Sequence, residues 1–221
     1  VITDHQTAGR GRLQRRWIAP PGSSLLMSLL LRPALQPAQV QQLTMISGLS
    51  VCDAVEAQTG LRAGLKWPND IVVSDAKLGG ILTEIEVQDN IVEYAIVGIG
   101  LNVGLKLTQL PKDLLMRATS LCNELGRPVS RVGLLWAFLL AFEKRYFLLK
   151  DGQSPHVEWS QRLTTLGRLV TVAGSSTVWA GMAEGVDRNG ALLVRHGCGE
   201  LETVLAGDVS VRFGQTGSDL L

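Results

Sequence analysis

The chain has 221 residues, 46% apolar and 19% charged, which favours one sizeable globular domain, or a medium domain with a small companion, and excludes wholesale disorder. Its formal net charge of +1 gives no global field that would attract nucleic acid or a membrane, and no apolar run approaches the ~20 residues that span a bilayer. Three scattered cysteines without a CxxC pair argue for a reducing compartment and against a disulfide framework or a zinc site.

The N-terminal loop, residues 4–16, combines glycines with four arginines. It follows residues 1–3, which have the pattern of a strand end, so we expect the sequence to begin inside a domain. Glycines expose backbone N–H groups and guanidinium groups match phosphate oxygens, so the loop suits a polyphosphate. A nucleic-acid patch and a solvated basic loop are the alternatives. Trp17 is expected to begin an apolar strand, with its ring either against a ligand or in the core.

The next segment predicts strands and one long helix. Residues 25–31 are apolar enough for a strand buried on both faces, and Pro37 opens a helix that Gly60 ends. Further strands are expected over residues 62–66, 82–87 and 91–97, with a turn at residues 88–90.

The segment KWPND, residues 66–70, places an amide and a carboxylate after a Trp-Pro pair that stiffens the backbone. A hairpin turning at residues 75–76 then sets Lys77 opposite Lys66, and Gly79 and Gly80 allow a ligand to approach the backbone. The same residues would also suit an ordinary polar hairpin with a glycine bulge. The segment GIGLN, residues 98–102, ends a strand with two glycines and an amide, and it lacks the GxGxxG spacing of a dinucleotide site.

The C-terminal half begins with helices and ends with strands. A short helix is expected to end at Gly126, and Ser130 is expected to cap a long helix to about Leu149. The residues expected to face inward from this long helix are Val132, Leu135, Trp136, Leu139 and Phe142. From Arg168 onward, short strands and tight turns predict a small SH3-like barrel.

Three sequence blocks follow one another along the chain: TAGRGRLQRRW at residues 7–17, KWPND with KLGGIL within residues 66–82, and VGIGLNV at residues 97–103. Together they closely resemble the catalytic domain of biotin protein ligases, enzymes that activate biotin with ATP and attach it to a lysine of a carrier protein. The resemblance implies an α+β fold, with a mixed or antiparallel sheet and helices (a class II synthetase-like biotin/lipoate ligase core), followed by the SH3-like barrel. The implied division is a catalytic domain at 1–165, a C-terminal domain at 166–214 and a tail at 215–221.

The resemblance also implies residue roles. Lys77 matches the most catalytic position, between the biotin carbonyl and the α-phosphate, and Arg12 and Arg15 lie on the phosphate side. The residues implied for biotin are Gln6, Arg10, Gly11, Arg12, Lys77, Gly79, Gly98 and Gly100. Those implied for ATP are Arg12, Arg15, Trp17, Asn69, Asp70 and Asn102, and Asp70 is the candidate ligand for Mg²⁺. Gln14 stands where many relatives have glycine.

The resemblance further implies a biotin carboxyl carrier protein as acceptor partner, a cytoplasmic location and a possible homodimer, with no membrane role and no support for DNA binding in this segment. A Ser-Thr segment that serves biotin in the family precedes the matched region and is not in this sequence. We therefore expect the chain as given to bind biotin more weakly than a longer form. A lipoate ligase is the closest enzyme alternative, although such enzymes lack KWPND. A non-enzymatic phosphate- or ligand-binding module is the alternative from another class.

Overall fold

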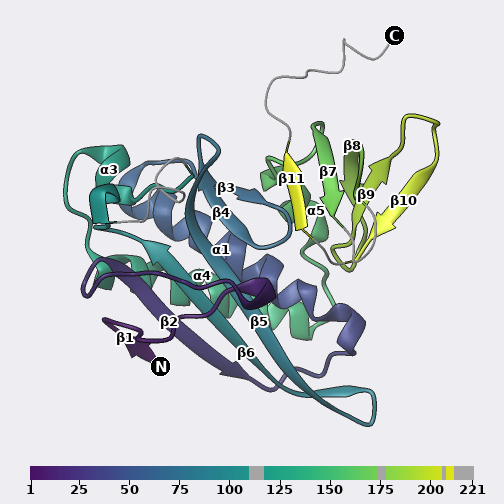
Figure 1. Cartoon of the computed structure of the whole chain (residues 1–221). Coiled ribbons are helices and arrows are strands. Elements are labelled where there is room, and N and C mark those ends of the chain that lie inside the picture. The colour runs from purple at the N-terminus through teal and green to yellow at the C-terminus, as the bar shows by residue number, and fades with distance from the viewer. Residues whose placement is uncertain (110–116, 174–177, 206–207, 212–221) are drawn as a thin grey trace.

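The structure, a computed structural model, describes residues 1–109, 117–173, 178–205 and 208–211 (Figure 1). A six-stranded sheet has the order β1-β2-β6-β5-β4-β3, and every pair of neighbours in it is antiparallel. Its strands are β1 (Ile2–Thr3), β2 (Ser24–Leu31), β3 (Gly64–Lys66), β4 (Asp70–Val73), β5 (Ala76–Gln88) and β6 (Ile91–Asn102). A separate antiparallel sheet, of order β10-β9-β8-β7-β11, follows in the chain. Its strands are β7 (Leu169–Ala173), β8 (Val178–Val186), β9 (Leu192–Arg195), β10 (Leu201–Val204) and β11 (Asp208–Val211). The predicted α+β class is confirmed.

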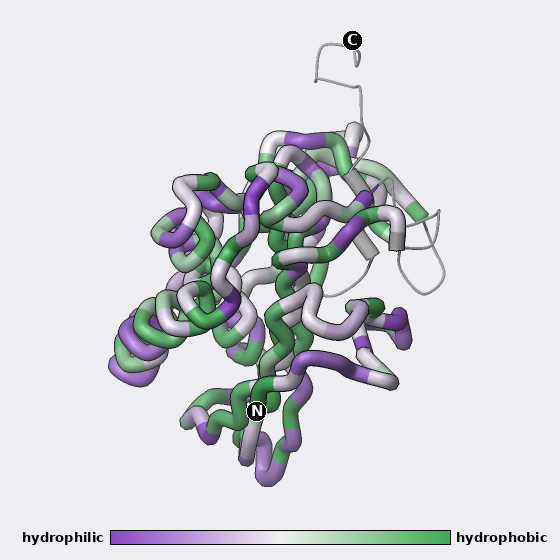
Figure 2. Tube along the Cα trace, turned by 90° about the vertical axis from the view of Figure 1, so that its left-hand side faces the viewer, coloured by the Kyte–Doolittle hydropathy of each residue, from purple (hydrophilic) through white to green (hydrophobic). Residues whose placement is uncertain are grey.

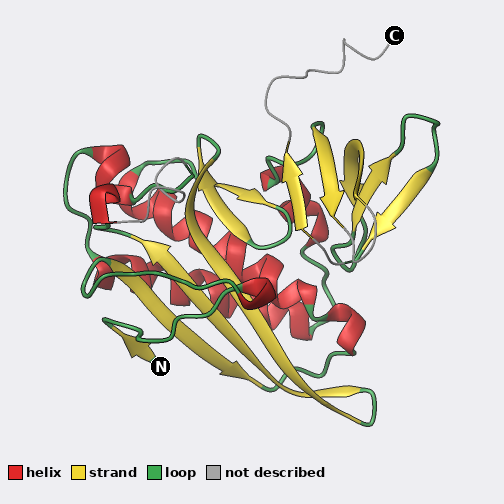
Figure 3. Cartoon of the chain, in the orientation of Figure 1, coloured by secondary structure: helices red, strands yellow, loops and turns green. Residues whose placement is uncertain are grey.

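Helices cover one face of the large sheet, and the loop of residues 7–17 crosses the other (Figures 1 and 3). The α-helices are α1 (Gln41–Thr59), α3 (Leu121–Leu125), α4 (Arg131–Lys150) and α5 (His156–Arg162). Three 3-10 turns, η1 (Arg12–Gln14), η2 (Pro37–Gln39) and η3 (Leu107–Gln109), complete the described elements. Seen from the side in Figure 2, the helices lie on the left of the sheet, so the sheet has a covered face and an open face.

Helix α1 forms the centre of the core because it is buried between the sheet and α4. Thirteen of its residues are buried, including Ser47 and Ser50, whose hydroxyls donate to main-chain carbonyls one turn back. Gly48 lets the helix approach the sheet, since a Cβ there would lie 3.0 Å from Leu65 Cδ2. Gly60 ends the helix in a left-handed conformation, as expected.

The buried face of α4 differs from the predicted one. Leu134, Phe138 and Phe142 pack inward, and the two phenylalanine rings stack with centroids 5.6 Å apart. Val132, Trp136 and Leu139 instead remain 76%, 65% and 37% exposed, so the prediction that these three residues face inward is wrong. This helix is apolar on more than one side, so the spacing of its apolar residues allows two different buried faces. Packing against α1 determines which of the two faces is buried.

Two other local expectations need correction. Trp17 does not begin a strand, because its backbone N–H donates to Gly9 O within the loop and the strand starts only at Ser24, after the Pro20–Pro21 pair. The hairpin before Lys77 turns at Ser74 and Asp75, whose φ angles of 48° and 68° are those of a type I′ turn, one residue earlier than expected. Among the described residues, no helix combines the length and the apolar character needed to cross a membrane.

Cysteine reactivity gives one test of this core. Burial raises the pKa of the Cys52 thiol on α1 to about 12, whereas Cys198 is exposed. Because the thiolate is the reactive form, an alkylating reagent at pH 8 should modify Cys198 rapidly and leave Cys52 unmodified until the protein unfolds. Peptide mass spectrometry of native and denatured samples measures this, and rapid native labelling of Cys52 would contradict the packing of α1.

Candidate active site

The centre of the candidate site is an ion pair between Lys77 on β5 and Asp70 on β4. Lys77 Nζ lies 2.5 Å from Asp70 Oδ1, and both side chains are partly exposed. A β-bulge brings them together: Ile71 pairs with Gly79 but Val72 pairs with Lys77, so Leu78 is the extra residue. Leu78 is fully buried, and Lys77 is thereby turned to the face that carries Asp70.

Two glycines form a floor beside Lys77. Gly80 pairs with Asp70 on one side and with Gly100 of β6 on the other. The indole of Trp17 lies on this floor, since a Cβ on Gly100 would be 2.6 Å from Trp17 Cε2. Lys77 Nζ is 5.8 Å from the centroid of the Trp17 ring, within the range of a cation–π contact. Glycine at both positions therefore makes room for a flat group under the loop.

The arginine loop, residues 7–17, closes on itself above this floor. Gly11 N–H donates to Arg15 O, and Trp17 N–H donates to Gly9 O. A Cβ on Gly9 would lie 2.6 Å from Trp17 O, so only glycine fits there. Gln14 has a φ of 60°, in the left-handed region that favours glycine. The family resemblance implies glycine at this position, and glycine would suit this backbone conformation.

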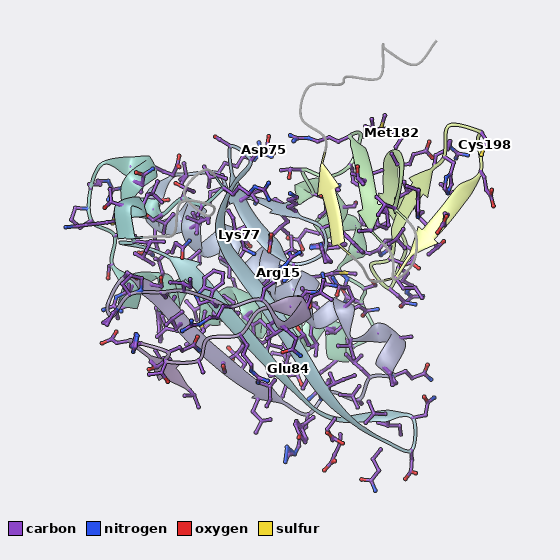
Figure 4. All side chains as sticks on the ribbon, in the orientation of Figure 1. Arg15, Asp75, Lys77, Glu84, Met182 and Cys198 are labelled. Atoms are coloured by element: carbon purple, nitrogen blue, oxygen red, sulfur yellow. The ribbon has the colours of Figure 1, made fainter. Side chains whose placement is uncertain are left out.

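Two arginines near the middle of the loop bond to side chains of the sheet and of the segment before β4. Arg12 Nη1 donates to Asn69 Oδ1 at 3.4 Å, and Asn69 is itself held by its side-chain donation to Ile81 O at 2.6 Å. Arg10 Nη2 donates to Glu84 Oε2 at 3.0 Å. Figure 4 shows Lys77, Arg15 and Glu84 following one another along the same side of the molecule. Through Arg10 and Arg12, the loop thus places cationic groups beside β5 and beside Asn69.

The Arg10–Glu84 pair should make a small contribution to the position of the loop. Exposed ion pairs contribute about 0–1 kcal/mol, so Glu84→Gln should raise tryptic cleavage within residues 10–16 by at most about fivefold. Glu86→Gln is the matched control, because Glu86 is on the same strand two residues further. Equal cleavage rates for the wild type, Glu84→Gln and Glu86→Gln would show that the pair does not hold the loop.

Asn102 lies at the end of β6 and is connected to Lys77 through a short segment. Its Nδ2 donates to Thr119 O at 3.0 Å, and Thr119 N–H donates to Lys77 O at 2.8 Å. Lys77 N–H in turn donates to Arg117 O at 2.7 Å. Asn102 is buried, and its Oδ1 accepts no hydrogen bond from any residue that the structure describes. A buried acceptor without a donor is a position where a ligand N–H could bind.

The structure therefore brings most of the predicted site residues to one place and sets some of them apart. Lys77, Asp70, Asn69, Arg12, Trp17 and Gly100 gather on the open face of the sheet. Gly79 instead faces the helices, because a Cβ there would meet the side chains of Ile71 and Leu101. Gly98 is on the same strand two residues before Gly100, and a Cβ there would meet Leu82 at ordinary contact distance. Gln6 lies next to Gly9, and the remaining loop residues Arg10, Arg15 and Arg16 border an open hollow of about 300 Å³.

Three features of the site were not predicted. Gly80 is the member of the glycine pair on the open face, and sequence alternation alone could not show this because the bulge at Leu78 shifts the register. No sequence pattern indicated that Glu84 would form an ion pair with Arg10 of the loop. The segment of residues 117–119, which joins Lys77 to Asn102, carries no signal in the sequence that distinguishes it from other loops.

Comparison with known proteins identifies the class. Residues 1–102 match the Biotin/lipoate A/B protein ligase family, and residues 165–212 match the Biotin protein ligase C terminal domain. These matches place the chain among proteins with the biotin/lipoate ligase core. The Biotin--[acetyl-CoA-carboxylase] ligase of Mycobacterium tuberculosis is 33% identical over 218 residues, covering 95% of this chain and 77% of that protein. The chain belongs to the biotin protein ligase family, as the three sequence blocks predicted.

Two further relatives add detail. The Bifunctional ligase/repressor BirA of Bacillus subtilis is 36% identical over 196 residues, or 88% of this chain. The chain spans 60% of the length of that relative. Among solved structures, the biotin protein ligase from Aquifex aeolicus in complex with biotin and ATP has a TM-score of 0.81 and 30% identity, covering 96% of this chain and 87% of that one.

Proposed function

We propose that this chain is an ATP-dependent biotin ligase that forms biotinyl-5′-AMP and transfers biotin to a lysine of a biotin carboxyl carrier protein. The observation that carries the proposal is the position of Lys77, beside a glycine floor and below a loop of arginines. Family membership and the similarity to an Aquifex aeolicus ligase described with biotin and ATP support it.

The chemistry requires two anions to react. The carboxylate of biotin attacks the α-phosphorus of ATP, the bond from that phosphorus to the bridging oxygen breaks, and pyrophosphate leaves with its electron pair. An acceptor lysine amine then attacks the mixed anhydride, AMP departs and the amine loses a proton. Fixed cations at the phosphate oxygens lower the first barrier, and holding the reactants in line supplies about 7–11 kcal/mol. We assign Lys77 to this role, with Arg12 and Arg15 on the phosphates.

The other predicted roles are distributed around this centre. We propose that Gln6, Arg10, Gly11, Gly79, Gly98 and Gly100 serve the biotin side, and that Trp17, Asn69, Asp70 and Asn102 serve the nucleotide side. Asn102 has the strongest geometric support in this group, because its buried Oδ1 can accept a hydrogen bond from an adenine amine. Gly79 has the weakest, because it faces the helices.

Asp70 fits a Mg²⁺ ion as a single protein ligand. Mg²⁺ is commonly held by one or two carboxylates together with substrate phosphates, and when bound it neutralises charge on the leaving pyrophosphate. Asp70 offers such a carboxylate beside Lys77. Within the described ranges no group of three or more His, Cys, Asp or Glu side chains could hold a metal by itself, which agrees with a site that depends on the phosphates.

The proposal also covers the domain division, the location and the assembly of the protein. We infer a catalytic domain of residues 1–165 and a C-terminal domain of residues 166–214, a cytoplasmic location and a homodimer as the candidate assembly. The predicted tail at residues 215–221 lies outside the described residues. DNA binding has no support in this chain, although the Bacillus relatives are named as repressors.

The direct test is transfer of biotin to an acceptor. Purified protein, ATP, Mg²⁺ and saturating biotin are incubated with a biotin carboxyl carrier domain, and the acceptor is analysed by intact-mass and peptide mass spectrometry. We expect biotin on a single lysine and no modification when lipoate replaces biotin. Modification by lipoate alone would favour the lipoate ligase alternative. An unmodified acceptor with both acids would favour a binding module.

The arginine loop should become protected when the adenylate forms. Its neighbouring like charges repel one another, so an anion that compensates them should hold the loop more firmly than the contacts of Arg10 and Arg12 do alone. Tryptic cleavage within residues 10–16 should fall sharply when biotin and ATP are added together, and much less with either ligand alone. Cleavage that proceeds at the same rate with and without both ligands would contradict the closing-loop interpretation.

A further inference from the structure

A buried side chain, Trp67, joins the KWPND segment to the C-terminal sheet. Trp67 is 2% exposed, and its indole Nε1 donates to Gly190 O at 2.8 Å. Its backbone N–H donates to Thr165 Oγ1 at 2.9 Å. Both partners lie beyond α5, at the start of the C-terminal region and in its β8–β9 turn, as Figure 1 shows for the two sheets. The residue that precedes Pro68 is therefore held from a distant part of the chain.

The turn that meets Trp67 is tightly built. Asp187 Oδ1 accepts from the backbone N–H groups of Asn189 and Ala191, at 2.8 and 2.9 Å, and Gly190 N–H donates to Asp187 O. Gly190 has a φ of 90°, and a Cβ there would lie 2.4 Å from Met45 Cε. Only glycine fits this position, for both its backbone conformation and its closeness to α1.

From Trp67 the contacts lead directly to the active-site candidates. Pro68 follows, and its carbonyl accepts from Gln41 Nε2 at 2.9 Å. The next two residues are Asn69, which meets Arg12, and Asp70, which meets Lys77. A second contact acts on the other side of Lys77, where Arg168 forms an ion pair at 2.8 Å with Asp75 in the hairpin turn.

We propose that Trp67 and Gly190 are positioning residues, through which the C-terminal sheet sets the orientation of Asn69 and Asp70 and hence of Lys77. This inference rests on the proposed function, because Lys77 is catalytic only there. Neither residue contacts the candidate substrate region. Both act by fixing the backbone segment that carries Asn69 and Asp70. The ion pair between Arg168 and Asp75 makes a weaker contribution of the same kind.

The test compares substitutions in this contact with a destabilising change elsewhere. Trp67→Phe removes the indole N–H and keeps most of the ring, and Gly190→Ala introduces a Cβ against Met45. Phe138→Leu on α4 is the control, because it loosens the core away from the corner. Steady-state pyrophosphate release gives kcat and KM for biotin, and thermal unfolding gives Tm for each variant.

We expect kcat to fall by at least about tenfold in Trp67→Phe and Gly190→Ala, because misplacement of a catalytic group by ~1 Å can cost about 10²-fold, with little change in KM for biotin. Phe138→Leu should keep kcat at a comparable loss of Tm. Wild-type kcat in both corner variants, or an equal loss in Phe138→Leu, would overturn the inference. Should the two corner variants fail to fold, Asp75→Asn is the substitute, with an expected decrease of about two- to fivefold in kcat, as for an exposed ion pair. An unchanged kcat in Asp75→Asn would then overturn the inference.

A readout that needs no enzymatic activity separates this inference from the proposed function. Lysines are acetylated with a soluble N-hydroxysuccinimide ester, and peptide mass spectrometry measures the acetylation rate of each lysine. Loosening the corner should release Lys77 from Asp70 and raise its acetylation rate relative to Lys144 in Gly190→Ala but not in Phe138→Leu. If the wild type releases no pyrophosphate, the proposed function fails. An unchanged acetylation rate of Lys77 in Gly190→Ala counts against the positioning inference.

Discussion

Replacing Lys77 by alanine is expected to reduce biotin-dependent pyrophosphate release by about 10²–10³-fold, the usual loss when one group that stabilises transition-state charge is removed. Lys77 is partly exposed at the site and its side chain is not part of the core, so the fold should remain intact. Lys77→Arg should recover only part of the activity, because a planar guanidinium cannot reproduce the point charge of an ammonium group at 2.5 Å from Asp70.

The matched control is Lys144→Ala, which removes an exposed lysine from α4 on the covered side of the sheet. Circular dichroism and thermal unfolding establish that both variants are folded. Near-normal pyrophosphate release in Lys77→Ala would remove the catalytic assignment of this residue, and a similar loss in Lys144→Ala would show that the effect is not specific to the site.

Replacing Gly100 by alanine should have the second large effect, through Trp17. The added methyl group would lie 2.6 Å from the indole, so the ring must leave the glycine floor and the arginine loop should open with it. We expect faster tryptic cleavage of the loop without ligands and at least about tenfold slower adenylate formation, because the arginines are no longer held near the phosphates.

Gly98→Ala provides the comparison two residues away on the same strand. Its Cβ would meet Leu82 O at 3.6 Å, an ordinary contact, so the cleavage rate of the unliganded loop should stay near that of the wild type. Biotin affinity of Gly98→Ala then reports separately on whether Gly98 lines the biotin slot. Equal cleavage rates for Gly100→Ala and Gly98→Ala would mean that Trp17 does not rest on Gly100 in solution.

The sequence predicted the elements whose signals are local. Gly60 and Gly126 end their helices in left-handed conformations, and Ser130 caps α4 by accepting from the N–H of Gly133. The strands and their order of appearance also follow from apolar runs and turn residues. These helix ends and turns could be predicted because turns and caps depend on a few neighbouring residues, whereas the α+β class was an expectation from the family resemblance.

Features set by distant contacts could not be predicted in the same way. The choice of the inward face of α4 depends on how Phe138 and Phe142 meet α1, and both available stripes are apolar. The bulge at Leu78 decides that Gly80 rather than Gly79 shares a face with Lys77. The hydrogen bond from Trp67 to Gly190 joins residues 123 positions apart, and no local pattern reports such a contact.

The candidate site could be predicted in part from the sequence. Lys77, Asp70 and Asn69 were identified from a short block in the sequence, and the structure places them within one corner of the sheet. Their relation to Arg12 and Trp17 was an expectation from family resemblance alone. The structure gives it a physical basis, because two glycines leave the space that the indole fills.

Direct detection of the adenylate is the best test of whether this chain joins biotin to AMP. Purified protein is incubated with ATP, Mg²⁺ and saturating biotin without any acceptor, and the quenched mixture is analysed by mass spectrometry and a pyrophosphate assay. We expect biotinyl-5′-AMP and pyrophosphate in equal amounts, both absent without biotin and both strongly reduced in Lys77→Ala. A folded protein that leaves ATP and biotin unchanged, or that releases pyrophosphate regardless of biotin, would contradict the proposed function.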